Sequence, residues 1–316
     1  MATVYAENVL SAKYSDEFRK GPVAYLSKGV WNPLGAVFAV CCVGASFGMG
    51  GMVQVNTFAE SLAGCLPVNR LLLAAACFLL IFAIVNGGAQ RIGTAAQLML
   101  PAASLAYAAA CITVILLRRD ALPEVIRRIF SEALDLRPAA GGVLGYALSV
   151  GIRRGVFSNE AGLGSSPILH TAAGETSGHT QGMWAMFEVF FDTMICCTLT
   201  AVTVLCGTDG TVTGALGLIP HLPAELFVTA ELGLFALCTV IGWYYCGEAA
   251  FLYLTKGRAG RLYCVLYSAA AAIGAVTAAR SVWAISDIFN GLMALPNLAG
   301  LVLLSGQVRC KQPHRD

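Results

Sequence analysis

Residues 153–167 read Arg153-Arg154-Gly155-Val156-Phe157-Ser158-Asn159-Glu160-Ala161-Gly162-Leu163-Gly164-Ser165-Ser166-Pro167, a glycine-rich and polar run inside an apolar segment of residues 141–173. In a helix interior Gly costs about 1 kcal/mol and Pro about 3 kcal/mol relative to Ala, and Ser and Asn compete for backbone hydrogen bonds. The run therefore predicts non-helical backbone at residues 157–164, flanked by two half-helices within one crossing. The alternative is an ordinary loop between two shorter helices.

The composition around this run is that of an integral membrane protein. Of the 316 residues, 57% are hydrophobic and 12% are charged, and the mean hydropathy is +0.72. So few polar side chains cannot cover a surface that faces water on all sides. The net charge is only +2, which argues against a nucleic-acid-binding surface. The 12 cysteines lie in apolar runs without a CxxC pair, and this indicates small apolar helix residues.

The apolar runs predict about eight membrane crossings, separated by Gly, Pro and charged residues. They cover residues 31–62, 70–86, 94–117, 141–173, 181–206, 223–254, 262–279 and 282–305. Residues 118–138 are amphipathic and favour a helix at the membrane interface. Residues 1–20 contain no cleavable signal peptide. Lys and Arg are more numerous on the side that holds both chain ends, which places that side in the cytoplasm. We expect one multi-pass domain over residues 1–316 in the cytoplasmic (inner) membrane.

A break at membrane depth has a functional meaning. Backbone outside a helix is tolerated there only where it is buried in protein or lines a cavity, and broken helices mark the binding sites of transporters. Freed N–H groups can hold a carboxylate and freed carbonyl groups can hold Na⁺. An unpaired carboxylate costs at least about 2.5 kcal/mol in hydrocarbon, so we expect Glu160 to have a partner or a proton. Ser158, Asn159 and Glu160 either contact the ligand or brace the broken backbone.

Other polar residues in the apolar runs are candidates for the same site. Gln54 and Asn56 diverge by about 200° on a helix, so only one of them can face a single site. Thr239 and Trp243 are four residues apart and share a face, as Glu188 and Asp192 do. For each of these residues the alternative is packing or a hydrogen bond between helices. His170 and His179 have no other typical metal ligands at a suitable spacing in the sequence, so no metal site is expected.

Several blocks resemble the alanine/glycine:cation symporter family, in the order that the family has them, and the resemblance covers essentially the whole chain. The strongest is residues 155–168, which are similar to the family's signature. The others are residues 50–56, 191–193, 238–248 and 290–298.

The resemblance implies an all-α fold of the leucine-transporter type, with two inverted repeats and a site at the bilayer midplane. In that scheme residues 139–306 form a complete second repeat and residues 307–316 a cytoplasmic tail. Residues 1–117 form an incomplete first repeat, which lacks the first helix and most of the second. Residues 1–7 resemble the end of that second helix, and residues 21–25 resemble the loop after it.

The resemblance also implies roles for individual residues. The substrate contacts are Gln54, Ser158, Asn159, Gly162 and Trp243. Thr239 would bind the cation. Glu160, Asn56 and Asp192 would support the site.

The expected function is Na⁺-coupled symport of a small neutral amino acid, alanine or glycine, by alternating access, with Na⁺ as coupling ion and no cofactor. The oligomeric state is open. One alternative is a truncated, transport-inactive remnant, and another is a non-transporting membrane subunit. An enzyme is not expected, because the sequence has no G-x-S-x-G and no H-E-x-x-H motif.

Overall fold

The structure is a computed structural model that describes residues 1–87, 89–133, 141–171 and 177–308. Over these residues all regular structure is helical. The N-terminal half contains α1 (Ala2–Tyr14), α2 (Pro22–Gly29), α3 (Asn32–Ala45), η1 (Ser46–Met52), α4 (Val53–Cys65), α5 (Arg70–Val85), α6 (Ala89–Leu117) and α7 (Leu122–Ala133). The C-terminal half contains α8 (Gly141–Asn159), α9 (Ser166–His170), α10 (Gly178–Phe190), η4 (Phe191–Cys196), α11 (Cys197–Cys206), α12 (Val212–Leu216), α13 (Ala224–Leu254), α14 (Gly260–Gly274), α15 (Ala279–Leu304) and η5 (Ser305–Gln307).

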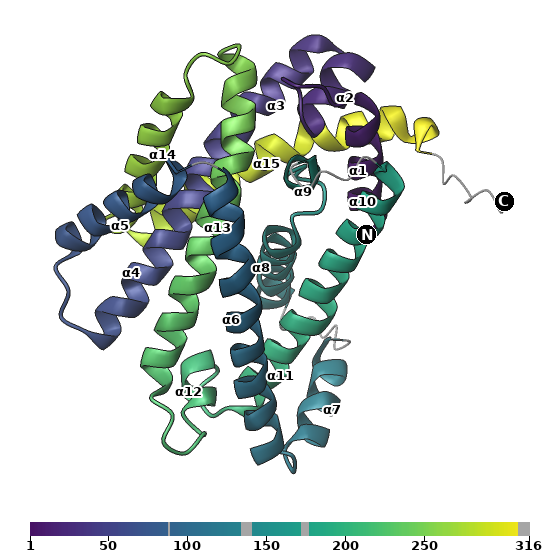
Figure 1. Cartoon of the computed structure of the whole chain (residues 1–316). Helices are drawn as coiled ribbons and strands as arrows, with labels where there is room; N and C mark the ends of the chain where they lie inside the picture. Colours follow the sequence, from purple (N-terminus) through teal and green to yellow (C-terminus); the bar gives the residue numbers. More distant parts are fainter. Residues whose placement is uncertain (88, 134–140, 172–176, 309–316) are drawn as a thin grey trace.

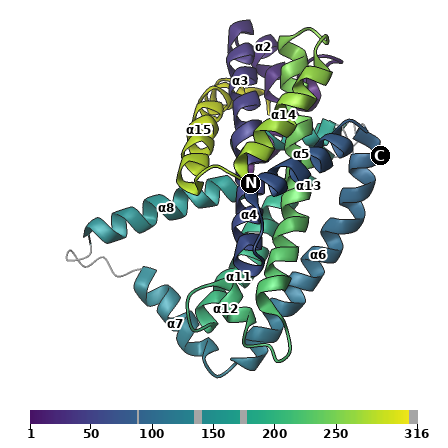
Figure 2. The same ribbon diagram turned by 90° about the vertical axis from the view of Figure 1, so that its left-hand side faces the viewer.

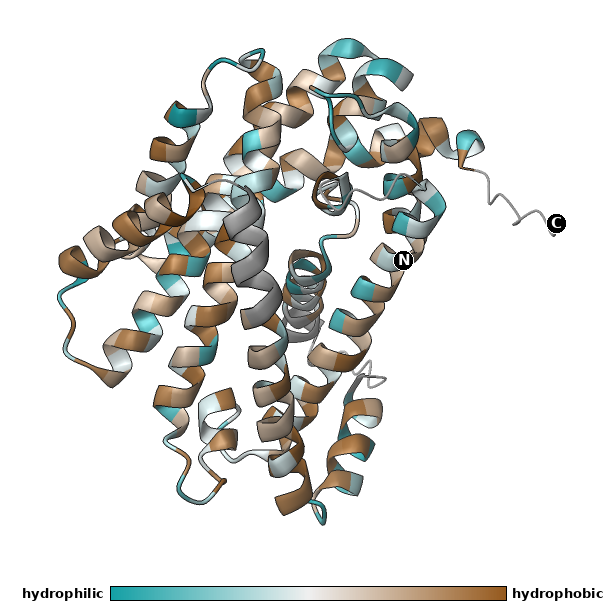
Figure 3. Ribbon diagram, in the orientation of Figure 1, coloured by the Kyte–Doolittle hydropathy of each residue, from teal (hydrophilic) through white to brown (hydrophobic). Residues whose placement is uncertain are grey.

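Five helical segments in the described part of the chain are long and apolar enough to cross a membrane. Hydrophobic residues, coloured brown, recur along the described helices (Figure 3). The helices are therefore those of a multi-pass integral membrane protein, as the composition predicts. The five segments are Asn32–Cys65, Met99–Leu117, Gly178–Cys206, Ala224–Leu254 and Ala279–Gln307.

Five of the eight apolar runs thus contain a described helix that reaches the length and composition of a membrane crossing. Residues 70–86 form α5, which has 16 residues, and residues 262–279 form α14, which has 15 and ends at Gly274. Both are shorter than the roughly 20 residues that a crossing needs. The end of α14 has a local cause, because the Asn56 amide donates to the carbonyl groups of Gly274 at 2.9 Å and Thr277 at 2.8 Å. These bonds satisfy backbone groups that a longer helix would use itself.

One correction concerns residues 21–25, which the family resemblance assigned to a loop. Helix α2 begins there, at Pro22. Proline favours the first position of a helix because its missing N–H group would have no partner there. Gly21 precedes it with φ of 57°, a conformation that glycine adopts without strain.

The centre of the bundle is the continuous helix α3–η1–α4, which packs against α13 on one side and α15 on another (Figures 1 and 2). Its middle part, η1, is a π-helical turn with three glycines, at positions 48, 50 and 51. Wide turns of this kind are rare and occur often at functional sites. Gly50 lets α13 approach closely, because a Cβ atom there would lie 2.2 Å from Trp243 Cβ.

Helix α8 is placed differently from the other long helices. Figure 2 shows it directed away from the bundle of α3, α13 and α15. Its contacts with the bundle lie near its C-terminal end, where Phe157 packs on Trp283 with ring centroids 5.0 Å apart. Arg154 forms an ion pair with Asp287 of α15 at 2.7 Å. Further toward the N-terminus, a Cβ atom at Gly145 or Gly151 would meet no other described part of the chain within 4 Å.

Candidate functional site

The predicted break is present between α8 and α9. It begins at Glu160 rather than at residue 157, because residues 157–159 continue α8. The Asn159 side-chain oxygen accepts a hydrogen bond from the Ala161 N–H group at 3.0 Å, which turns the backbone out of the helix. The flanking helices are unequal, with 19 residues in α8 and 5 in α9.

Three residues of the break have left-handed backbone: Glu160 with φ of 53°, Gly162 with 93° and Gly164 with 84°. Glycine accepts this conformation, whereas a glutamate there is uncommon and is held by its surroundings. Space also requires a glycine at 164, since a Cβ atom would lie 2.2 Å from Cγ of Pro22. The turn is thus fitted against the start of α2.

The Glu160 carboxylate has the partners that its burial demands. One oxygen accepts a hydrogen bond from the Ser165 hydroxyl, across the turn. The other accepts from the indole Nε1 of Trp243 at 3.0 Å. Trp243 is 4% exposed, so its ring faces the break and not the lipid. Glu160 therefore links the broken backbone to α13.

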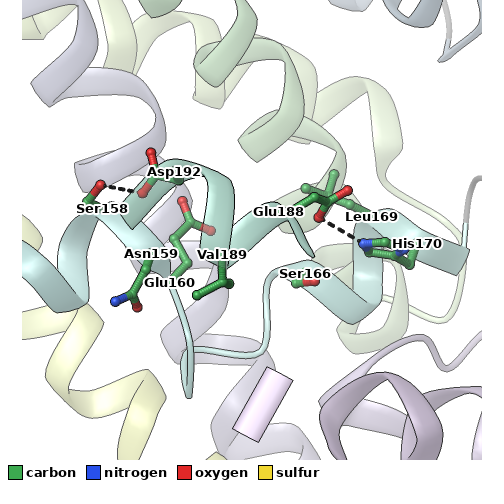
Figure 4. A pocket seen from close by; sticks show the side chains of 9 residues that line it. All are labelled: Ser158, Asn159, Glu160, Ser166, Leu169, His170, Glu188, Val189 and Asp192. Carbon is green, nitrogen blue, oxygen red and sulfur yellow. Dashed lines mark hydrogen bonds and ion pairs between the residues drawn. The ribbon is translucent and has the colours of Figure 1, made fainter. Parts of the chain in front are cut away.

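Beside the break lies a cavity of about 410 Å³, with walls from α8, the turn, α9, α10 and η4 (Figure 4). The Ser158 hydroxyl donates to Asp192 Oδ2 at 2.8 Å, and His170 Nε2 lies 3.1 Å from Glu188 Oε2. The lining residues are Ser158, Asn159, Glu160, Ser166, Leu169, His170, Glu188, Val189 and Asp192. Five candidates from the sequence thus share one cavity: Ser158, Asn159, Glu160, Glu188 and Asp192.

The remaining candidates lie elsewhere around the break. Gly162 is inside it, and its carbonyl accepts from Asn297 Nδ2 at 2.9 Å. The Gln54 amide donates to the Met49 carbonyl at 3.2 Å within its own helix. The Thr239 hydroxyl donates to the Phe235 carbonyl at 2.9 Å, one turn before Trp243 on α13.

Neither Gln54 nor Thr239 lines the cavity of Figure 4. Both hydrogen bonds of Asn56 go to the end of α14. The structure therefore joins Trp243 to the break through Glu160, while Gln54, Asn56 and Thr239 have partners in other parts of the fold.

Three residues around the break carried no role in the sequence analysis. Ser165 binds Glu160, and Asn297 binds both Gly162 and Glu7. Asn297 and Glu7 are polar residues in apolar surroundings, and each is 0% exposed. That pattern was visible in the sequence, but the sequence did not indicate that α1 and α15 meet at the turn.

The polar side chains of the cavity are three carboxylates, two hydroxyls, an amide and one imidazole, so most of the atoms that could bind a ligand are oxygens. Oxygen ligands suit hard cations. No group of three or more His, Cys, Asp or Glu side chains able to hold a metal ion occurs within the described residues. All eleven cysteines in the described ranges are free thiols.

The sequence profile of the sodium:alanine symporter family matches residues 1–312. The chain belongs to this family. It is accordingly a symporter, a multi-pass membrane protein, and not an enzyme. The family's description names alanine and sodium as what its members carry.

Named relatives agree with membership of the sodium:alanine symporter family. The chain is 36% identical over 331 residues to the sodium/alanine symporter AgcS of Methanococcus maripaludis, covering 98% of this chain and 73% of that protein. It is 34% identical over 321 residues to the amino-acid carrier protein AlsT of Bacillus subtilis, covering 96% and 68%. It is 34% identical over 324 residues to the probable sodium/glutamine symporter GlnT of Bacillus subtilis, covering 96% and 67%.

Proposed function

We propose that this member of the sodium:alanine symporter family moves alanine or glycine together with Na⁺ across the cytoplasmic membrane. The observation that carries the proposal is the turn of residues 160–165, bound to Trp243 through Glu160 and open to a cavity. Non-helical backbone beside a cavity offers N–H and C=O groups to a small zwitterion and a cation. The family match gives no reason to prefer the alternative of a transport-inactive remnant.

The proposed mechanism is alternating access in an inverted-repeat fold. Its support is the non-helical turn between α8 and α9 beside a cavity, because broken helices next to a cavity are typical of inverted-repeat transporters. The two halves of the chain also pack closely on each other, with α1 against α10 and α3–η1–α4 against both α13 and α15. We expect Na⁺ to stabilise the state that binds the amino acid, because a ligand shifts an equilibrium only through differential affinity.

Within this proposal, Gln54, Ser158, Asn159, Gly162 and Trp243 bind the amino acid, and Thr239 binds the cation. Ser158 supports it most directly, because its hydroxyl lies on the cavity wall beside the Asp192 carboxylate. Thr239 keeps its oxygen lone pairs available, since its own hydrogen bond uses only the hydroxyl proton.

The test is uptake of radiolabelled alanine into proteoliposomes with an inward Na⁺ gradient, an equal K⁺ gradient, or none. We expect saturable uptake that requires the Na⁺ gradient. Unlabelled glycine should compete, whereas unlabelled glutamine should not. If only glutamine competes, the proposed substrate is wrong, and glutamine, the substrate named for the Bacillus subtilis relative, would replace it. Uptake that is equal under all three gradients would contradict sodium coupling.

A further inference from the structure

A second polar cluster lies behind the break, on the side of α1. Glu7 is 0% exposed, and its Oε1 accepts a hydrogen bond from Asn297 Nδ2 at 2.6 Å. The same nitrogen donates to the Gly162 carbonyl at 2.9 Å, and Asn297 Oδ1 accepts from the Tyr25 hydroxyl. The cluster therefore joins α1, α2, the turn and α15 at one buried point.

The second carboxyl oxygen of Glu7 is the unusual feature. Oε2 is buried and makes no hydrogen bond of good geometry among the described residues, although the backbone N–H group of Gly162 interacts favourably with the carboxyl group. Glu7 also takes part in none of the ion pairs found in residues 1–87, 89–133, 141–171 and 177–308. A buried carboxylate without a cation costs several kcal/mol, whereas a neutral carboxylic acid costs far less.

The ionisable groups around Glu7 do not compensate a negative charge. Its nearest charged neighbour on the turn is Glu160, which repels a second carboxylate, and Tyr25 of α2 is neutral and fully buried. The Met1 amino group at the start of α1 is attractive, but it forms no ion pair with Glu7. Lys13 points to Gln307 at the opposite end of α1. On the neighbouring helices, His179 of α10 forms a hydrogen bond with Tyr5, and His170 of α9 forms one with Glu188.

A metal ion fits this point poorly. A hard cation needs several oxygen ligands at once. The oxygens of Asn297 and Gly162 already accept hydrogen bonds, and Glu7 Oε1 accepts one as well. Among the oxygens of this cluster only Oε2 of Glu7 forms no hydrogen bond, and one oxygen suffices for a proton.

We propose that Glu7 is a proton-binding site, neutral while the turn of residues 160–165 packs against α1 and α15 as it does here. When the turn moves, the Oε2–H bond breaks, its electron pair stays on the carboxylate, and the proton passes to water. Protonation thus stabilises the packed arrangement of the turn. The link between this proton and the transport cycle rests on the proposed function, while the protonation itself does not.

The variant Glu7→Gln tests the site, because glutamine has the shape of the neutral acid and cannot ionise. The matched control is Glu17→Gln, which removes an exposed carboxylate just beyond α1. The first measurement is infrared spectroscopy of the purified proteins at neutral pH. We expect a carboxylic-acid C=O band in the parent protein and in the control, and its loss in Glu7→Gln. A band of equal strength in all three proteins would overturn the proposal.

The second measurement is Na⁺-driven alanine uptake between about pH 6 and about pH 10, a range in which a single proton changes a rate by up to about tenfold per pH unit. We expect parent uptake to fall on the alkaline side and Glu7→Gln to remove that slope. A slope that is unchanged in Glu7→Gln would contradict the coupling to the cycle. If none of the three proteins transports alanine, the proposed function is wrong. The infrared measurement still decides whether Glu7 binds a proton. Loss of Na⁺-dependent thermal stabilisation in Glu7→Gln, without loss of the acid band, would make Glu7 a cation ligand and overturn the proposal.

Discussion

At the scale of single residues, Glu160 combines the features that make the break a site. It has left-handed backbone, and its carboxylate binds Ser165 within the turn and Trp243 on α13. The sequence analysis left two roles open for Glu160, ligand contact and bracing. Both carboxylate oxygens have protein partners here, which is the geometry of bracing. Its place on the cavity wall keeps its charge within reach of a bound molecule.

The bond between Trp243 and Glu160 gives a residue-scale prediction. Trp243→Phe keeps an aromatic ring but removes the indole N–H donor. Because hydrogen bonds to charged groups are worth about 1.5 to 3 kcal/mol, we expect a thermal stability loss of that order and weaker alanine uptake. The control is Trp184→Phe on α10, since Trp184 is 59% exposed. Equal stability and uptake of the two variants in detergent and in proteoliposomes would show that the bond has no role.

At the scale of elements, the turn between α8 and α9 depends on glycine where the backbone is left-handed and α2 is close. We predict that Gly164→Ala destabilises the protein by about 1 to 3 kcal/mol, because alanine at φ of 84° is strained and its Cβ would meet Pro22.

Helix α8 offers the matched control for that substitution. At Gly151 the backbone is helical, and a Cβ atom would meet no other described part of the chain within 4 Å. Gly151→Ala should therefore leave stability unchanged or raise it by up to about 1 kcal/mol, through helix propensity. Thermal unfolding of both variants checks the pair, and opposite signs are expected. A Gly164→Ala variant as stable as the parent would mean that the turn is not packed against α2 as described.

At the scale of the whole molecule, α8 joins the bundle through its last turns. Arg154 donates two hydrogen bonds to Asp287, at 2.8 Å and 2.7 Å, and its guanidinium carbon lies 4.4 Å from the centre of the Trp283 ring. A planar guanidinium makes both contacts at once, which an ammonium group cannot do. This clamp connects the helix before the break with α15, the helix that supplies Asn297 behind it.

We predict that Arg154→Lys loosens α8 although the charge is kept. Hydrogen exchange of the amides in residues 145–159 should become faster, and Na⁺-driven alanine uptake should fall. The control is Arg153→Lys, because Arg153 is exposed and bonds only the Ser149 carbonyl of its own helix, at 3.3 Å, among the contacts described. Exchange rates that match in the two variants would contradict the clamp.

The sequence by itself determined the class of the molecule and the position of its break. Scarcity of charge requires lipid as solvent, and the glycines and serines of residues 162–166 disfavour a helix, so both conclusions follow from local chemistry. The sequence did not indicate where α14 ends, because the hydropathy of residues 262–279 does not reveal that Asn56 binds the end of α14 at Gly274. It also placed residues 21–25 in a loop, where Pro22 begins a helix.

Only the tertiary structure decided which distant residues meet at the break. Trp243 lies 83 positions from Glu160, and Asn297 lies 290 positions from Glu7. Hydrophobic periodicity indicates which face of a helix is buried, but not which other helix covers it. That choice depends on close approaches such as Gly50 against Trp243, which require one particular packing of α13 on η1. The partners of Glu160 and of Glu7 are therefore properties of the folded chain, although each residue is visible in the sequence as a carboxylate in an apolar setting.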